Sequence, residues 1–541
     1  MTKVLSPDDK TANGYDFIII GGGSAGSVLA GRLSEDPNCQ VLLLEAGGSD
    51  RHPFYHVPAG FAKMTKGIGS WGWETVPQRH MQGKIFRYTQ GKVIGGGSAV
   101  NAQIYTRGNA QDYDDWRQMG CDGWGYDDVL PYFKKAEDNE TFDNAYHGKG
   151  GPLGVSEPRA PLPICEAYFD AAAALGIPRN MDVNAGKQDG VCYYQLNQRN
   201  VRRSSAAMAY VTPNRHRPNL TVKLGAQVRR LVVEGGRATA VELLDGTRLT
   251  AASEVLLASG AIGSPRLLQL SGIGPADHLN GLGIKVVHDQ PQVGSNLQDH
   301  LDLYCISELS GPYSYDRYAK PHWAAIAGLQ YIFGRKGPIA SSLFETGGFW
   351  YADPHARSPD IQFHLGLGTG IEHGVAAMPQ GGVTLNSCYL RPRSRGTVRL
   401  QNADPASAPL IDPNYLQDPL DREMSIRGLK LTQEILSQSA LKDYILAERF
   451  PGPDVKTDED YFNFISVHSK TSHHCAGTCR MGPDEAAVVD TQLRFNGIDG
   501  LRVVDNSIMP TVISSNTNAA AIMIAEKSAD MIKAQYGMST Q

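Results

Sequence analysis

The apolar positions near the N-terminus predict a strand, a helix and a second strand in close succession. Asp16–Ile20 is an apolar, β-branched run of strand length, residues 27–33 repeat apolar side chains at helical spacing, and Val41–Glu45 reads as a second buried strand. Glycines at 21, 23 and 26 separate the first strand from the helix. We therefore expect a βαβ unit whose turn carries the G-x-G-x-x-G pattern.

Each residue of that turn has a physical reason to be there. Gly21 permits the tight turn, Gly23 lets backbone N–H groups approach a pyrophosphate, and Gly26 allows helix and strand to pack closely. The helix N-terminus then faces the two phosphates. Glu45 closes the second strand, where a carboxylate accepts a hydrogen bond from a ribose 2′-OH, which argues against a 2′-phosphate. A glycine-rich turn alone gives the same letters, but with both strands, the helix and the acid in place the unit predicts NAD or FAD binding.

The rest of the pattern divides the chain into alternating pieces of two domains. Strands with turns at Gly235-Gly236 and Asp245-Gly246 occupy residues 219–257, and Leu501–Pro510 is another buried strand. An irregular stretch runs from Glu45 to about Gln90, and an alternating strand is expected after His300. Helices are expected at residues 112–135, 161–175 and 421–439, with an amphipathic helix at 519–534. We predict a discontinuous nucleotide-binding domain (1–155, 207–303, 470–541) and a second, sheet-based domain (156–206, 304–469).

Composition narrows the class of protein. A chain of 541 residues is long enough for two to four domains, and its net charge of −5 with no basic block argues against a nucleic-acid partner. The polar N-terminus does not resemble a secretory signal, and no apolar run approaches bilayer length, so we expect no transmembrane segment, while peripheral membrane attachment stays open. The eight cysteines are scattered apart from Cys475 and Cys479, which favours reduced thiols and the cytoplasm.

Five blocks in order resemble the glucose–methanol–choline (GMC) oxidoreductases, a family of FAD flavoproteins. They are the βαβ unit with EAGG (45–48), GKVIGGGSAVNAQIYTRGN (91–109), GAIGSPRLLQLSGIGP (260–275), LRPRSRGTVRL…IDPNYL (390–416), and HHCAGTCRMG followed by VVDNSIMPTVISSNTNAAAIMIAEKSAD. The resemblance implies an α/β fold, with a Rossmann-like FAD domain and a substrate domain built on a mixed or antiparallel sheet. It also implies FAD rather than NAD, and an FAD-dependent enzyme that oxidises a primary alcohol to an aldehyde. The alternatives are a choline-type dehydrogenase, a non-redox lyase like the hydroxynitrile lyases of the family, and a flavin-bound sensor without turnover.

The resemblance places catalysis on His474 and Asn516, and their chemistry is consistent with that placement. Moving a hydride from an alcohol carbon to flavin N5 requires the hydroxyl proton to leave, and a neutral imidazole can accept it near neutral pH. An amide can orient the substrate oxygen but cannot act as the base, so the base is expected to be His474.

Three other interpretations of these residues remain open. His473, His474, Cys475 and Cys479 could form a metal cluster, although their spacing matches no common zinc site, so we expect no metal. His474 could be a structural core histidine, with His473 a bystander. Asn516 could cap the helix that begins near Ala519.

The resemblance also implies the contacts to FAD. Asp505 is expected near the ribityl or pyrophosphate region, Asn518 at the flavin pyrimidine and Val228 at the adenine. Some members bind FAD covalently through a His at the position of Val100, so here FAD should be non-covalent. The full predicted set is Gly21, Gly23, Ser24, Ala25, Gly26, Glu45, Ala46, Gly95, Gly96, Ser98, Asn101, Val228, Gly260, Asp505, Asn516 and Asn518.

The alcohol and the electron acceptor stay open at this point. Glu345 aligns loosely with a carboxylate that choline-oxidising members turn toward the substrate cation. Aromatics such as Trp71, Trp73, Phe344 and Trp350 could line an apolar pocket or could be packing. Electrons could pass to oxygen or to another acceptor, and the protein could be a monomer or a homodimer.

Overall fold

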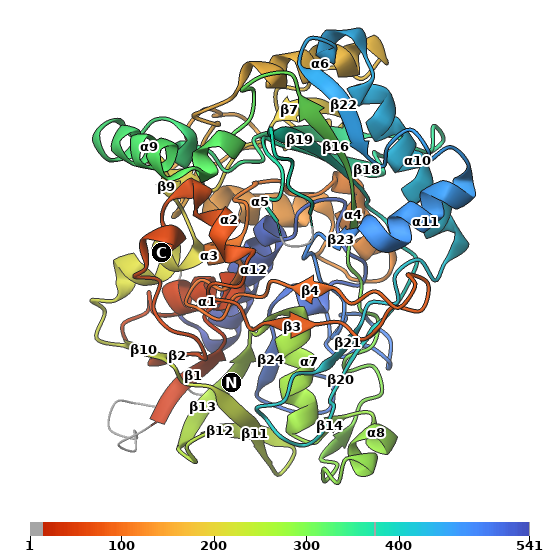
Figure 1. The fold of residues 1–541 in the computed structure, drawn as a ribbon. Coiled ribbons are helices and arrows are strands. Elements are labelled where there is room, and N and C mark those ends of the chain that lie inside the picture. The colour runs from red at the N-terminus through yellow and green to blue at the C-terminus, as the bar shows by residue number, and fades with distance from the viewer. Residues whose placement is uncertain (1–13, 373–374, 540–541) are drawn as a thin grey trace.

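The structure, a computed structural model, describes residues 14–372 and 375–539. The polar N-terminal segment discussed above lies almost wholly outside the described residues. Two large sheets organise the rest, the first in the lower part of Figure 1 and the second in the upper part. No helix in these described ranges is long and apolar enough to cross a membrane.

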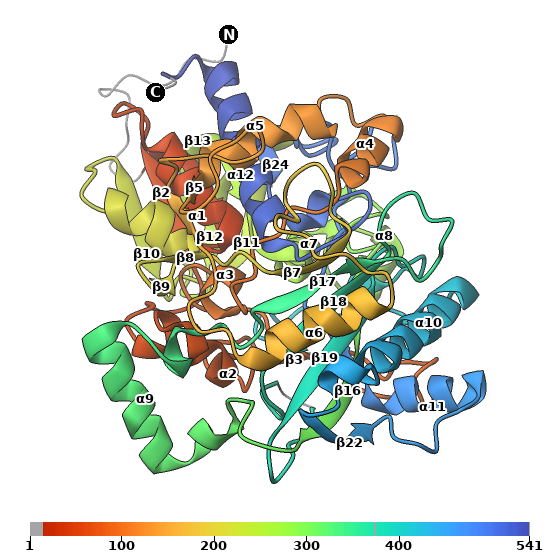
Figure 2. The ribbon, with the colours of Figure 1, turned by 90° about the horizontal axis from the view of Figure 1, so that it is seen from above.

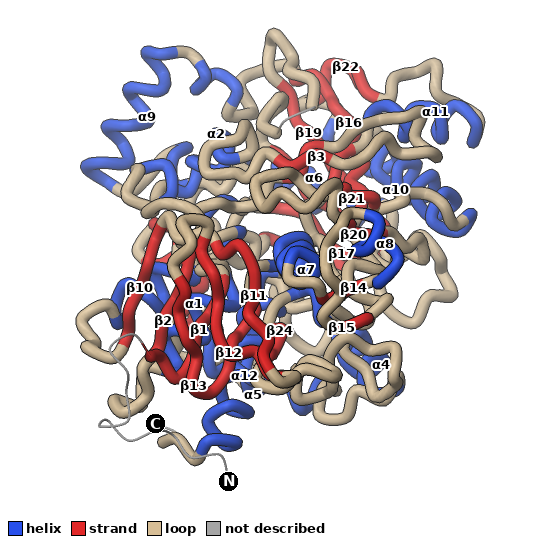
Figure 3. The backbone as a smooth tube through the Cα atoms, turned by 90° about the horizontal axis from the view of Figure 1, so that it is seen from below, coloured by secondary structure: helices blue, strands red, loops and turns tan. Residues whose placement is uncertain are grey.

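The first sheet contains the predicted βαβ unit. Its strands are β1 (Gly14–Ile20), β2 (Val41–Glu45), β10 (Leu220–Leu224), β11 (Val228–Glu234), β12 (Arg237–Leu243), β13 (Arg248–Leu257) and β24 (Leu501–Val503). They lie in the order β10-β2-β1-β13-β12-β11, with β24 beside β13, as Figure 3 shows. β1 runs parallel to both neighbours, and the chain turns back at Gly235-Gly236 and Asp245-Gly246 to give the predicted antiparallel strands. The predicted strand–helix–strand order is confirmed.

Helix α1 (Ser24–Leu33) follows the glycine turn and packs beside α12 (Asn518–Tyr536), which also contacts α5 (Tyr126–Ala136). Gly26 is required where α1 packs against the end of β1, because a Cβ there would lie 1.8 Å from the Gly21 carbonyl oxygen. The prediction that the last helix is amphipathic is wrong: its residues from Ala519 to Ala529 are all buried. The helix is enclosed because α1 and α5 flank it.

The second sheet is built from strands far apart in sequence. They are β7 (Gly190–Tyr193), β16 (Leu301–Leu309), β17 (Thr346–Trp350), β18 (Ile361–Gly366), β19 (Gly382–Tyr389), β22 (Ile445–Phe450) and β23 (Lys470–Thr471). Their order is β22-β16-β19-β18-β17-β7, all neighbours are antiparallel, and β23 pairs with β16. The expected alternation in β16 is wrong, since all nine residues are buried. Helix α10 (Pro419–Leu436) contacts this strand, while Asp302 from the same strand lines an internal cavity.

Shorter elements surround the two sheets. The other helices are α2 (Phe61–Met64), α3 (Gly97–Val100), α4 (Ala110–Gln118), α6 (Pro163–Ala174), α7 (Gly260–Leu270), α8 (Ala276–Gly281), α9 (Pro321–Gly334) and α11 (Asp458–His468). The short strands pair as β3 (Trp73–Glu74) with β4 (Arg87–Tyr88), β5 (Glu137–Asn139) with β6 (Leu153–Val155), β8 (Gln198–Arg199) with β9 (Arg202–Arg203), β14 (Ile273–Gly274) with β15 (His288–Asp289), and β20 (Thr397–Arg399) with β21 (Leu410–Asp412). The stretch after Glu45 is therefore irregular but contains α2, β3 and β4. The sequence pattern did not reveal α9 or α11.

We propose that the two sheets mark the two predicted domains. Two predicted domain boundaries cut the second sheet. The boundary after residue 303 falls inside β16, and the boundary before residue 470 separates β23 from its partner β16. On this proposal the boundaries lie after residue 300 and after residue 471.

Candidate active site

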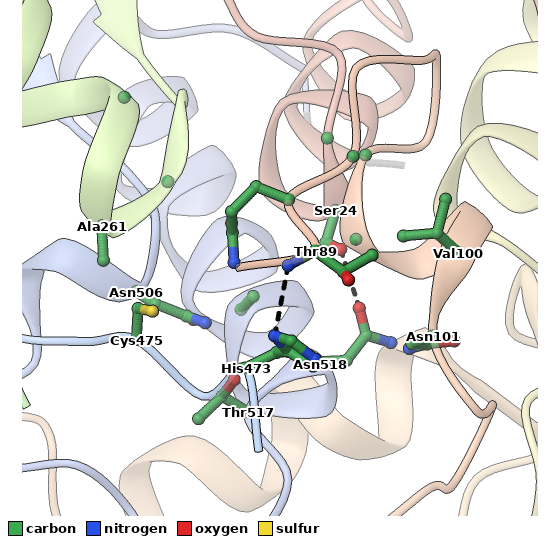
Figure 4. A pocket seen from close by; sticks show the side chains of 18 of the residues that line it. Ser24, Thr89, Val100, Asn101, Ala261, His473, Cys475, Asn506, Thr517 and Asn518 are labelled. Atoms are coloured by element: carbon green, nitrogen blue, oxygen red, sulfur yellow. Dashed lines mark hydrogen bonds between the residues drawn. The ribbon is translucent and has the colours of Figure 1, made fainter. Parts of the chain in front are cut away.

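One cavity extends from the glycine turn of the first sheet to the loop before α12. At one end it is lined by Gly23, Glu45 and Val228, and at the other by His474 and Asn516. The predicted cofactor contacts that line it are Gly21, Gly23, Ser24, Ala25, Glu45, Ala46, Gly96, Asn101, Val228, Gly260, Asp505, Asn516 and Asn518. Figure 4 shows Ser24 and Asn518 joined by a hydrogen bond inside this cavity, although they are 494 residues apart in sequence.

Three predicted cofactor contacts lie outside the lining. Gly26 faces the Gly21 carbonyl, as described above. Gly95 has φ +92°, and a Cβ there would meet Ala99 and Ala207 instead of the cavity. The Ser98 hydroxyl donates to the Gly95 carbonyl at 2.6 Å and accepts from the Ala206 N–H at 2.9 Å, so it braces the loop.

The nucleotide end of the cavity suits a dinucleotide. Glu45 accepts hydrogen bonds from the backbone N–H groups of Gly22 (2.8 Å) and Gly47 (2.6 Å), which leaves lone pairs for a ribose hydroxyl. Burial raises the pKa of Glu45 to about 6. Helix α1 begins at this point with no side-chain cap on its N–H groups, so they are free to bind a pyrophosphate. Gly260 also lines the cavity with open space beside it, since a Cβ added there would have no atom within 4 Å.

The other end of the cavity faces the N-terminus of α12. Thr517 occupies its N-cap position and makes no side-chain cap, so the helix presents bare N–H groups to the cavity. Such a terminus stabilises negative charge, as a reduced flavin carries at its N1–C2=O edge. The suggestion that Asn516 caps this helix is wrong, because its side chain bonds elsewhere. Asp505 already holds the Gly260 N–H (2.9 Å) and the Ser264 hydroxyl (2.6 Å).

A chain of hydrogen bonds fixes which nitrogen of His474 carries a proton. The Leu390 carbonyl can only accept, so the His300 Nε2, 3.0 Å away, must be protonated. Burial lowers the pKa of His300 to about 4, so its ring is neutral and its Nδ1 is bare. That nitrogen lies 3.0 Å from His474 Nδ1 and accepts its proton in a hydrogen bond. Burial and the neighbouring His300 and His364 rings also lower the pKa of His474 well below its ordinary value. The result is a neutral His474 whose Nε2 carries no proton and can accept a hydrogen bond.

Asn516 is oriented by its own partners. Its Oδ1 accepts from the Gln362 amide (2.9 Å) and the Thr106 hydroxyl (3.1 Å), so its Nδ2 must be the atom that donates to His474 Nε2 at 3.0 Å. The amide and the imidazole are thus held together at the cavity wall. A proton acceptor and a hydrogen-bond donor for one oxygen atom lie side by side there.

Three consecutive residues hold the segments that carry His474 and Asn516 in place, and the sequence analysis assigned them no function. Gln298 accepts from the Val512 N–H at 3.1 Å, in the segment that leads to Asn516. Asp299 accepts from the His474 backbone N–H at 2.7 Å, and His300 positions the His474 side chain. The one available signal is the run of polar residues immediately before a buried strand.

A buried ion cluster faces the same cavity and was also missed. Lys470 pairs with Asp302 and, at 2.9 Å, with Glu372, and all three line the cavity. Burial opposes the charge of Lys470, but the two carboxylates raise its pKa above the ordinary value. The cluster connects residues up to 168 positions apart, so no local sequence pattern could have predicted it.

The remaining candidates take different positions. His473 lines the cavity but accepts from the Thr89 N–H at 3.3 Å (Figure 4), and burial lowers its pKa to about 3. Glu345 is fully buried, its pKa raised to about 7 by burial, and it is not part of the cavity lining, unlike Phe344 beside it. Trp71 and Trp73 line the cavity, whereas Trp350 does not.

The metal interpretation has no geometric support. Cys475 and Cys479 are buried free thiols. Across residues 14–372 and 375–539, no group of three or more His, Cys, Asp or Glu side chains is arranged to hold a metal ion.

Known protein families and relatives match most of this chain. The family models described as GMC oxidoreductase match residues 15–302 and 392–525. The chain is 40% identical over 537 residues to an alcohol dehydrogenase [acceptor] of Pseudomonas putida, covering 97% of each chain. It is 42% identical over 542 residues to an oxygen-dependent choline dehydrogenase of Shigella flexneri, covering 97% of this chain and 96% of the relative.

Solved structures give the same fold. Pyridoxine 4-oxidase from Mesorbium loti superposes with a TM-score of 0.87 at 34% identity, covering 97% of this chain and all of the other. A variant of formate oxidase from Aspergillus oryzae superposes with a TM-score of 0.91 at 26% identity, covering 98% of this chain and 99% of the other.

Proposed function

Because this chain belongs to the GMC oxidoreductase family, we propose that it oxidises a primary alcohol to an aldehyde with FAD as the oxidant and His474 as the base. The chain is an oxidoreductase, and the relatives named alcohol dehydrogenase and choline dehydrogenase support a CH–OH donor. The observation that carries the proposal is the unprotonated Nε2 of a neutral His474, held beside the Asn516 amide at the cavity wall.

His474 and Asn516 divide the work on the hydroxyl group. The alcohol O–H donates to His474 Nε2, while the alcohol oxygen accepts from Asn516 Nδ2–H. This arrangement points the carbinol C–H in one direction and weakens the O–H bond at the same time. As the proton moves to Nε2, His474 keeps its Nδ1–H bond to His300, so the ring does not need to turn. When bound, FAD supplies the two-electron acceptor for the hydride from the carbinol carbon.

We propose that FAD is held without a covalent bond. The side chain at position 100 is a valine that lines the cavity and has no nucleophilic atom (Figure 4). Flavin released into the supernatant after acid precipitation supports this, and flavin that stays with the denatured protein contradicts it.

We propose a neutral alcohol with an apolar body, rather than a quaternary ammonium alcohol, as the substrate, because each carboxylate that lines the cavity already has a partner. Trp71 and Trp73 stack with ring centroids 4.9 Å apart, and both line the cavity. Four carboxylates line it: Glu45 and Asp505 accept from backbone N–H groups, and Asp302 and Glu372 are paired with Lys470. Glu345 lies behind the wall and has no access to a cation.

The test is anaerobic reduction of the bound flavin by a panel of primary alcohols that includes choline. We expect bleaching by neutral primary alcohols, and recovery of colour in air gives the rate at which oxygen serves as acceptor. Faster bleaching by choline establishes the choline-type alternative, and turnover with no bleaching establishes the lyase alternative.

We also propose the cytoplasm as the compartment. Seven buried cysteines are free thiols, which suits a reducing environment: Cys121, Cys165, Cys192, Cys305, Cys388, Cys475 and Cys479.

A further inference from the structure

Helix α9 presents an apolar face to solvent. Ile326, Leu329, Ile332 and Phe333 are 41%, 56%, 68% and 84% exposed. At 100° per residue these four side chains share one side of the helix, while the buried Ala327 and Tyr331 lie on the other. The arrangement is the reverse of an ordinary surface helix, whose apolar side faces the core. Figures 1 and 2 show α9 at the outer edge of the molecule.

The helix is anchored from its inner side. The Tyr331 hydroxyl donates to the Val201 carbonyl at 2.7 Å, and the Arg335 guanidinium lies 5.0 Å from the Tyr331 ring centre. The exposed side is therefore a fixed surface of the fold.

The segment that carries this face has charged residues of one sign. Residues 317–344 contain Arg317, Lys320, Arg335 and Lys336 and no Asp or Glu, in a chain whose net charge is −5. These four basic residues are exposed and flank the helix at both ends. Arg317 stacks on the rings of Tyr318 and Trp323 at 5.0 and 5.1 Å, so amphipathic aromatic rings lie next to the basic residues.

We propose that the α9 face (Ile326, Leu329, Ile332, Phe333) and its basic flanks form a docking surface for an anionic lipid bilayer. The helix has 14 residues, a length of about 21 Å, which is too short to span a bilayer but suits a helix lying in the interface. Apolar side chains then enter the acyl boundary, aromatic rings lie at the headgroup level, and Arg and Lys meet anionic headgroups.

The same charges argue against a second copy of this chain as the occupant. A two-fold contact between α9 helices running antiparallel brings Lys320 of one copy beside Arg335 and Lys336 of the other. Like charges meeting in this way are unfavourable, whereas an anionic surface satisfies all four basic residues at once.

Docking through α9 brings one wall of the cavity close to the bilayer. The chain continues from α9 through the turn Pro338–Ala340, which contacts the turn Pro58–Gly60 ahead of α2, to Phe344. Phe344 packs edge-on against Phe61 of α2 at 5.8 Å, and both rings line the cavity. An apolar alcohol or an acceptor dissolved in the membrane would therefore have a short path to the site.

The test is flotation of the FAD-loaded protein with vesicles of phosphatidylcholine alone and of phosphatidylcholine mixed with phosphatidylglycerol. We expect binding to the mixed vesicles that weakens as salt increases. The double variant Leu329→Ser/Phe333→Ser should bind about tenfold more weakly or worse, because two large apolar side chains no longer enter the acyl boundary. Arg335→Glu/Lys336→Glu should lose at least about tenfold on the mixed vesicles.

Matched controls change similar residues elsewhere. Met181→Ser/Leu446→Ser removes apolar side chains that are 72% and 58% exposed, and Lys442→Glu/Lys456→Glu reverses two exposed lysines, so both variants should bind as the parent does. The proposal is overturned if the parent binds neither kind of vesicle, or if the α9 variants bind as the parent does. It is also overturned if sedimentation shows a dimer that Leu329→Ser/Phe333→Ser dissociates. Because vesicle binding does not depend on turnover, its outcome is independent of the proposed alcohol oxidation.

Discussion

Replacing His300 by leucine should slow the reaction without removing any atom that touches the substrate. His300 Nδ1 is the acceptor for His474 Nδ1–H at 3.0 Å, and both rings are buried. In His300→Leu that N–H has no acceptor, and leaving a buried donor unpaired costs about 1–3 kcal/mol. His474 cannot avoid this by moving its proton to Nε2, because Asn516 Nδ2 donates to that atom and Gln362 and Thr106 hold the amide in that orientation.

This cost falls on the catalytic orientation of His474, so the rate of flavin reduction should fall by about 10- to 100-fold. The matched variant is His300→Asn, which has nearly the shape of leucine but places an acceptor oxygen close to the lost Nδ1. Stopped-flow reduction under anaerobic conditions measures both variants, with flavin content and Tm as controls. We expect the Asn variant to recover most of the rate. Equal rates for His300→Leu and the parent, or an equal loss in both variants, refute the reasoning.

Three further predictions follow from the site and the fold. Because burial lowers the pKa of His474, its neutral form predominates through neutral pH, so the rate of flavin reduction should be constant from about pH 6.5 upward. A pH–rate profile whose acid limb is centred at or above the ordinary histidine pKa of about 6.5 contradicts this. Glu45→Ala removes the acceptor for two backbone N–H groups and for a ribose hydroxyl, so a fluorescence titration should show that FAD binds at least about tenfold more weakly. An unchanged affinity for FAD excludes Glu45 as the ribose acceptor. Gly26→Ala places a Cβ 1.8 Å from the Gly21 carbonyl oxygen and should abolish the folding transition in a thermal melt. The control Gly48→Ala adds a Cβ that has no atom within 4 Å, so it should melt like the parent. Equal melting of the two variants is incompatible with the packing described.

The sequence was most informative where structure is determined locally. The βαβ unit was predicted because Asp16–Ile20 and Val41–Glu45 carry strand patterns on either side of a glycine turn, all within about thirty residues. The GMC resemblance was confirmed by family matches and relatives over nearly the whole chain, and it suggested His474 and Asn516. The roles of these two residues remain proposals until variants are measured.

Features that depend on distant contacts escaped the sequence analysis. His300 and His474 are 174 positions apart, and only the folded chain shows that their rings share a hydrogen bond. The last helix looked amphipathic because its polar residues suggested a solvent-exposed side, whereas Glu526 is buried in a pair with Arg32 of α1. Helix α9 escaped notice because apolar residues in sequence normally indicate a core, and only exposure in the fold reveals the opposite.

The central claim is that His474 is the base for alcohol oxidation, and the most direct measurement is anaerobic flavin reduction in His474→Ala. Removing a positioned general base costs about 10²- to 10⁴-fold in rate. We predict a loss in that range with FAD bound and the fold intact, and an Asn516→Ala variant that weakens substrate binding as well as the rate. A His474→Ala protein that keeps its FAD and is reduced by the alcohol at the parent rate would contradict the account.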